Sequence, residues 1–114
     1  TAFAVAGKAL DLHLVPEAVV FLGEVPLVPF QPPGSQELAE AIVPYLEDYD
    51  AVLLENHGVI CWGSDLEQAY HRLETVEFCA AVTLYAQMLG GARELPAEHL
   101  QNLLAVRRMM KGRP

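Results

Sequence analysis

The sequence has 114 residues, of which 53% are hydrophobic, and its formal net charge is −8. This length and composition suit one folded domain, residues 1–114, rather than a disordered chain. Fifteen acidic residues against seven basic ones argue against nucleic acid and anionic membrane as partners, because both require a basic surface. No apolar stretch approaches the roughly 20 residues that cross a bilayer, and no secretory signal pattern is present.

The basic residues and the cysteines suggest no special chemistry. Four of the seven bases crowd the end of the chain, and we interpret them as a solvated helix end and tail. They are Arg107, Arg108, Lys111 and Arg113. Cys61 and Cys79 form neither a CxxC motif nor a disulfide scaffold. We expect both to be reduced, small core residues of a cytoplasmic protein.

The chain begins with two short elements. TAFAVAG, which ends in Gly7, predicts a short helix. Because Thr1 opens directly into this pattern, we expect the sequence to be a piece of a longer protein. EAVVFLG, residues 17–23, is rich in β-branched and aromatic residues and closes in glycine, so it predicts a strand.

Proline shapes the next two elements. VPLVPF, residues 25–30, contains Pro26 and Pro29 and can form only an edge strand or an irregular strand. After the loop QPPGS, Ser35 is a candidate N-cap for a helix with apolar residues at helical spacing. Pro44 lies inside that pattern and should kink or shorten the helix.

The second half of the chain predicts two strands and two helices. The apolar runs AVLLE and VICWG, residues 51–55 and 59–63, indicate strands. In SDLE, Ser64 is expected to cap a long helix that ends at Gly90–Gly91. Pro96 fits the first turn of a last helix. Strands between helices without strict alternation predict an α/β fold with a sheet covered by helices, and no nucleotide-binding motif is present.

His57, between the two apolar runs, is the sharpest candidate for chemistry. The end of a buried strand is a good platform for a metal ligand, because packing fixes the side chain before the metal arrives. Gly58 removes a side chain next to the ring and leaves room for substrate or metal. The alternative is a turn histidine bonded to a neighbouring carbonyl, and a lone histidine does not decide between the two.

The residues near His57 do not complete a metal site. Cys61 shares its face on a regular strand but lies about 13 Å away. Glu55 is about 7 Å away between Cα atoms and could just converge on the same ion. Since a catalytic zinc site takes three protein ligands, the remainder must come from elsewhere.

The other polar and aromatic candidates are weaker. We expect His71 and His99 to face solvent on helices, and His13, which has apolar neighbours, to be a core or interface histidine. Glu77 shares a helix face with apolar residues, so we expect it to be partly buried and paired, with a catalytic carboxylate as the lesser alternative. Trp62 is expected to have a core or subunit-contact role.

One long stretch is similar to a known family. GSQELAEAIVPYLEDYDAVLLENHGVICWGSDLEQAYHRLETVEFCAAVTLYAQMLGG resembles the C-terminal half of the class II aldolase/adducin family. The matching features are a strand leading into Asn56-His57-Gly58, a second strand ending in Gly63, and a long helix containing ETVEFCAA. TAFAVAG and VPLVPFQPPGS also fit, so the resemblance extends to about Gly91.

The resemblance implies a fold and a metal ligand. The fold would have a central mixed or antiparallel sheet flanked by helices in three α/β/α layers, here as an incomplete domain. His57 would be the third ligand of Zn²⁺ or another divalent metal. The family's other two ligands come from a His-x-His-Pro segment that this sequence lacks. Its acid/base carboxylate and phosphate-binding loops are likewise expected upstream of Thr1, so this chain alone should neither hold zinc tightly nor turn over substrate.

The resemblance also implies a function. It is that of a zinc-dependent lyase, such as L-fuculose-phosphate aldolase, which cleaves a sugar phosphate in retro-aldol fashion through a metal-stabilised enediolate. The expected partners are a small sugar phosphate and further copies of the chain in a homotetramer. Some members use a tyrosine proton donor, but LHLVPE, residues 12–17, has none. A sugar-phosphate 4-epimerase, a sugar-acid phosphate decarboxylase and a non-catalytic adducin-like interaction domain therefore remain open.

Overall fold

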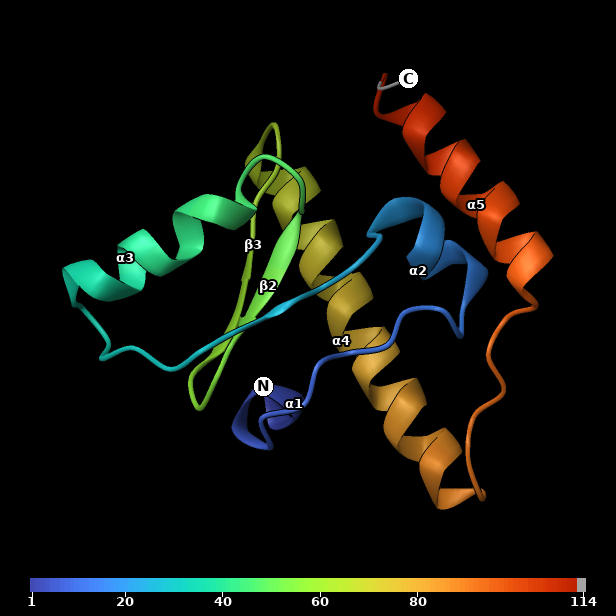
Figure 1. Cartoon of the computed structure of the whole chain (residues 1–114), viewed down its shortest axis with the longest axis horizontal. Coiled ribbons are helices and arrows are strands. Elements are labelled where there is room, and N and C mark those ends of the chain that lie inside the picture. Colours follow the sequence, from blue (N-terminus) through green and yellow to red (C-terminus); the bar gives the residue numbers. More distant parts are fainter. Residues whose placement is uncertain (113–114) are drawn as a thin grey trace.

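The computed structural model describes residues 1–112 as helices packed around a small β-sheet (Figure 1). In chain order the elements are α1 (Ala2–Val5), α2 (Pro16–Phe21), β1 (Leu27–Val28), α3 (Gln36–Ile42), the 3₁₀ helix η1 (Val43–Tyr45), β2 (Ala51–Leu54), β3 (Gly58–Cys61), α4 (Leu66–Met88) and α5 (Ala97–Met110). The strands lie in the order β1-β2-β3, with β1 parallel and β3 antiparallel to β2. The sheet is therefore mixed, as predicted.

Helices cover both faces of the sheet, and the central strand β2 is therefore buried on both sides. Ala51 and Leu53 of β2 pack into a core cluster with residues of α1, α2 and α4. Val52 and Leu54 alternate to the opposite face and pack against α3 and η1. The helices and the sheet thus form three α/β/α layers in an incomplete domain, as the family resemblance implies. No helix within residues 1–112 is long and apolar enough to span a bilayer.

The prediction of a strand over residues 17–23 is wrong, because this segment forms α2. Pro16 stands in the first turn, where its fixed φ favours a helix, and Gly23 ends the helix with a φ of 77°. Ala18 and Leu22, four residues apart, are both buried in the core. Start and stop signals together with packing thus outweigh the β-branched composition.

The observed start and end of α3 agree with the sequence prediction, and the start of α4 nearly does. Ser35 Oγ caps α3 by accepting a backbone N–H bond at 3.1 Å, and the α-helix gives way to η1 at Pro44. The predicted cap of α4 is wrong by one residue, since Asp65 and not Ser64 occupies the N-cap. Asp65 Oδ1 accepts a bond from Gln68 N at 2.7 Å.

Both cysteines and the tryptophan take the expected core positions. Cys79 is buried, and Cys61 is half-buried against the same cluster. Burial raises the pKa of each thiol to about 11. Trp62 packs against the second cluster, on the face opposite to Cys61.

The double burial of β2 yields a stability prediction. Leu53 is 1% exposed, so Leu53→Ala should lower the free energy of unfolding by about 2–5 kcal/mol through lost burial and a residual cavity. Leu66→Ala is the matched control, because Leu66 is 87% exposed and should change stability by less than about 0.5 kcal/mol. Urea denaturation measures both, and equal losses would contradict the described core.

Candidate functional site

The turn between β2 and β3 carries the candidate metal ligand. Residues 55–57 connect the strands, and His57 N donates a hydrogen bond to Leu54 O at 3.0 Å. Asn56 adopts a φ of 59°, a left-handed conformation that asparagine tolerates better than most residues. Its backbone N–H also donates to Ala4 O at 2.9 Å, so the turn is fixed to α1 as well as to the sheet.

The His57 side chain is exposed at this fixed turn. Among residues 1–112 it makes no hydrogen bond and no ion pair, so the alternative of a ring bonded to a neighbouring carbonyl does not describe it. The space beside it is open, because a Cβ at Gly58 would meet only Thr1 Oγ1, at 3.8 Å. An exposed imidazole on a fixed backbone suits one position of a metal site.

The described part of the chain does not assemble the other ligands. Within residues 1–112 no group of three His, Cys, Asp or Glu side chains could hold a metal ion. Glu55 is half-buried in the same turn, while Cys61 packs into the core at the far end of β3. A three-ligand site at His57 would therefore need at least one ligand from outside these residues.

For the other histidines and for Glu77, the structure agrees with some of the predicted exposures and not with others. His71 and His99 are exposed, as predicted, and His13 is half-buried. The predicted burial of Glu77 is wrong, because its side chain is 56% exposed. Nothing in this surrounding distinguishes Glu77 as a catalytic carboxylate.

A second polar centre, at the opposite end of β2, was missed by the sequence analysis. The Asp50 side chain is only 7% exposed, and its carboxylate accepts hydrogen bonds from Arg107 Nη2 at 2.6 Å and Lys111 Nζ at 2.9 Å. Arg72 Nη2 lies 3.5 Å from the same carboxylate. These four residues, here called the Asp50 cluster, tie α4 and α5 to the start of the central strand.

The Asp50 cluster overturns part of the interpretation of the basic chain end. Arg107 and Lys111 are 12% and 21% exposed at their side chains, so they are not solvated. Arg108 is exposed, as predicted, and Arg113 lies outside the described residues. The available signals were an acid directly before a buried strand and two bases four residues apart, which share one face of a helix.

The charges around Asp50 decide its ionisation. Burial of the carboxyl group opposes ionisation, but hydrogen bonds from Lys111 and Arg107 and the charge of Arg72 outweigh burial. The pKa of Asp50 therefore lies below its ordinary value of 3.8. A carboxyl group whose pKa falls on folding stabilises the protein above its unfolded pKa, and this contribution is lost as the pH falls through the folded pKa.

This sign yields a pH prediction. Asp50→Asn should destabilise the protein by about 3 kcal/mol at pH 7, because three cations lose their shared anion. The difference from the unsubstituted protein should begin to shrink below about pH 4, where Asp50 of the unfolded chain takes up a proton, and it should continue to shrink toward the lower pKa of the folded protein. Urea denaturation from pH 3 to 7 measures it, with the exposed Asp48→Asn as a control expected to stay within about 0.5 kcal/mol. A pH-independent difference would contradict the assignment.

Comparisons with known proteins match the chain to a family model and to relatives that include sugar-phosphate aldolases and a decarboxylase. Residues 1–84 match the model described as Class II Aldolase and Adducin N-terminal domain. An L-fuculose phosphate aldolase of Methanococcus maripaludis is 38% identical over 90 residues, which cover 79% of this chain and 48% of that protein.

Solved structures give the same result at the level of the fold. L-fuculose 1-phosphate aldolase has a TM-score of 0.79 and 27% identity, covering 91% of this chain and 49% of that chain. YgbL of Escherichia coli, whose description names aldolase, epimerase and decarboxylase together, has a TM-score of 0.72 and 32% identity. The match covers 80% of this chain and 44% of the YgbL chain. The chain thus spans about half the length of the relatives that it matches.

Proposed function

Because this chain belongs to the class II aldolase and adducin family, we propose that it is part of a metal-dependent lyase that cleaves a sugar phosphate in retro-aldol fashion. In this proposal residues 1–114 form a single, incomplete domain of that enzyme. The observation that carries the proposal is the His57 imidazole, which is exposed and has no partner among residues 1–112. Its turn is the segment on which the family resemblance is most specific.

His57 would act as one ligand of a divalent metal ion, with Zn²⁺ as the first choice. A neutral imidazole nitrogen is a common zinc ligand, and it must be free of other bonds to coordinate. Such an ion supplies Lewis-acid activation of the carbonyl and hydroxyl oxygens of a ketose phosphate. The chain's own contribution is to hold the imidazole in place, through the bonds of His57 N to β2 and of Asn56 N to α1.

A different reaction on the same scaffold is the second candidate. The similarity to YgbL, whose description names three activities, favours keeping a 4-epimerase and a sugar-acid phosphate decarboxylase beside the aldolase. The segment at residues 12–17, which lacks a tyrosine, also argues against a strict transfer of the fuculose-phosphate reaction. A non-catalytic, adducin-like interaction domain is the third candidate, and it would need no metal at His57.

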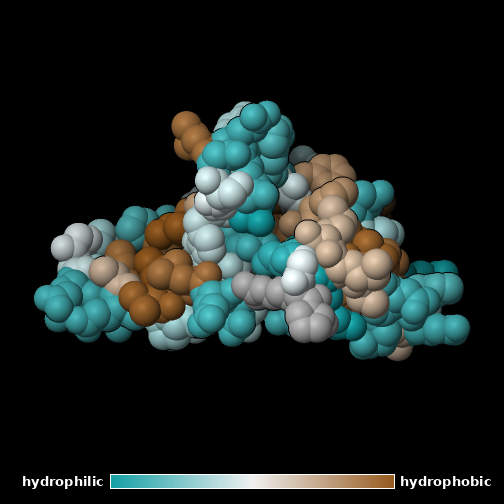
Figure 2. All heavy atoms as spheres, turned by 90° about the horizontal axis from the view of Figure 1, so that it is seen from above, coloured by the Kyte–Doolittle hydropathy of each residue, from teal (hydrophilic) through white to brown (hydrophobic). Residues whose placement is uncertain are grey.

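We also propose that the protein is a homo-oligomer, a tetramer by family resemblance. Hydrophobic side chains gather over α3 and η1 on the face in Figure 2, where Val43 is 61% exposed. Further large hydrophobic residues are exposed on the second half of α4 and at its end; they are Phe78, Leu84, Tyr85, Met88 and Leu89. Exposed apolar surface of this extent is typical of contact regions. The two free cysteines fit the proposed cytoplasmic location.

Metal analysis of the intact protein tests the ligand role. His57→Ala should lower zinc affinity by at least about 100-fold, because a coordinate bond is lost rather than an outer hydrogen bond. His71→Ala is the matched control, since this histidine is also exposed but lies on α4. Equal zinc affinity in His57→Ala and the unsubstituted protein would refute the ligand role.

The reaction is tested separately with a panel of sugar phosphates and sugar-acid phosphates. Release of dihydroxyacetone phosphate identifies the aldolase, release of carbon dioxide the decarboxylase, and a changed stereocentre the epimerase. Absence of both bound metal and turnover of any of these substrates would favour the interaction domain.

A further inference from the structure

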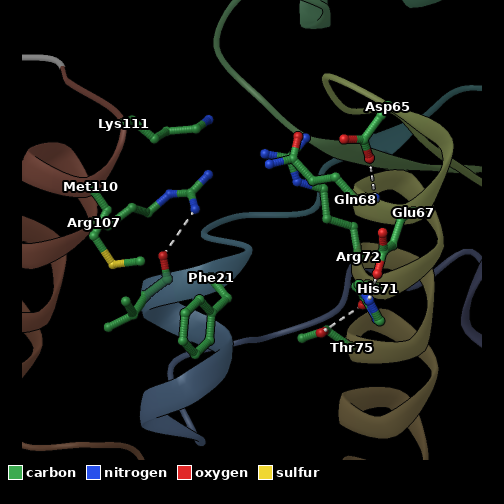
Figure 3. Close-up of a pocket in the computed structure, with 11 residues that line it drawn as sticks. Phe21, Asp65, Glu67, Gln68, His71, Arg72, Thr75, Arg107, Met110 and Lys111 are labelled. Carbon is green, nitrogen blue, oxygen red and sulfur yellow. Dashed lines mark hydrogen bonds and ion pairs between the residues drawn. The ribbon is translucent and has the colours of Figure 1, made fainter.

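A cavity of about 710 Å³ lies beside the Asp50 cluster, between α2, the start of α4 and the end of α5. Figure 3 shows Arg72 reaching from α4 toward Arg107 and Lys111, which reach from α5. The Asp50 cluster lies at the start of β2, whereas the β2–β3 turn with His57 lies at the other end of β2, next to α1 (Figure 1). We propose that this cavity binds the phosphate group of a small phosphorylated metabolite, at a site separate from His57.

The charge of the cluster is the first argument. Three cations surround one carboxylate, which leaves two positive charges without an anion inside the cluster. Their side chains are only 12–21% exposed, so water screens them less than it screens surface charges. A phosphate dianion supplies the two missing negative charges and oxygen acceptors for the free N–H groups.

The geometry of the two arginines is the second argument. Arg72 Nη1 donates to Trp62 O at 2.6 Å, and Arg107 Nη1 donates to Val20 O at 3.1 Å. Each guanidinium has five N–H donors, so these bonds fix the groups while further donors stay available. Donors that are already held in place lose little entropy when an anion binds.

Gly23 shows that the backbone leaves space for one of these arginines. A Cβ at this position would lie 2.5 Å from Arg107 Nε and 2.9 Å from its Cζ, which is closer than real contacts allow. Gly23 also has a positive φ, so a larger residue would be strained in its backbone as well. The glycine that ends α2 is thus also the residue that admits the Arg107 side chain.

Acidic and apolar groups at the same cavity define where the ligand lies. Asp65 and Glu67 line it too, but Asp65 accepts the α4 capping bond and Glu67 lies 3.6 Å from His71. The anion therefore belongs at the cationic end, away from these two carboxylates. Phe21 and Met110 line the cavity as well and offer apolar contact to the organic part of a phosphate ester.

Calorimetric titration of the intact protein with inorganic phosphate, at constant ionic strength, tests the site. We expect saturable binding, and Lys111→Gln should weaken it at least about tenfold, because one charge-assisted contact is lost. Arg108→Gln, which removes an exposed charge from the same helix, should change binding less than about twofold. Glycerol phosphate should bind at least as tightly as inorganic phosphate, because its carbon chain gains apolar contact.

Two further results separate this site from the one at His57. His57→Ala should leave phosphate binding unchanged, even where it weakens metal binding. Circular dichroism serves to check that Lys111→Gln remains folded. Gly23→Ala provides a second variant and should also weaken binding, because it displaces Arg107. Absence of saturable binding, equal effects of Lys111→Gln and Arg108→Gln, or loss of binding in His57→Ala would each overturn the proposal.

Discussion

The burial of β2 on both faces is the constraint on which the rest of the structure depends. All four of its residues are buried, and they alternate between a cluster with α1, α2 and α4 and a cluster with α3 and η1. A one-residue shift in register would exchange the two faces, so packing specifies the register strongly. Everything attached to the two ends of this strand is consequently placed with little freedom.

The two ends of β2 carry different chemistry. At its end, the chain turns through Asn56 and presents His57 to the outside, without a partner among the described residues. At its start, Asp50 receives three cations from α4 and α5, while its backbone oxygen accepts a bond from Trp62 N at 3.2 Å. One end is thus open to a ligand from outside, and the other holds the helices to the sheet.

Local sequence patterns predicted the parts of the fold that local interactions decide. The two apolar runs around His57, the Ser35 cap and the stop at Pro44 all have short-range causes, and the structure confirms them. In residues 17–23 the β-branched composition favours a strand, but the proline before the segment and the glycine at its end favour the helix that forms. Those two residues act on backbone geometry directly, whereas β propensity depends on whether a sheet neighbour is available.

The candidate site was predictable only in part. His57 could be named because a histidine beside a glycine interrupts two strands, but no group of three candidate ligands is assembled within residues 1–112. The Asp50 cluster was missed because Asp50 meets Arg107 and Lys111 across 57 and 61 residues of sequence. Such pairs follow from how α5 packs. The acid before β2 and the two bases on one face of α5 mark possible partners, but they do not show that these partners meet.

The central claim is that His57 binds a divalent metal ion from the end of a fixed hairpin. The most direct measurement is a crystal structure of the intact, zinc-loaded protein with anomalous data collected at the zinc edge. The account predicts an anomalous peak about 2.0–2.1 Å from a ring nitrogen of His57. A fully coordinated zinc ion elsewhere, with the His57 ring free of it, would contradict the account.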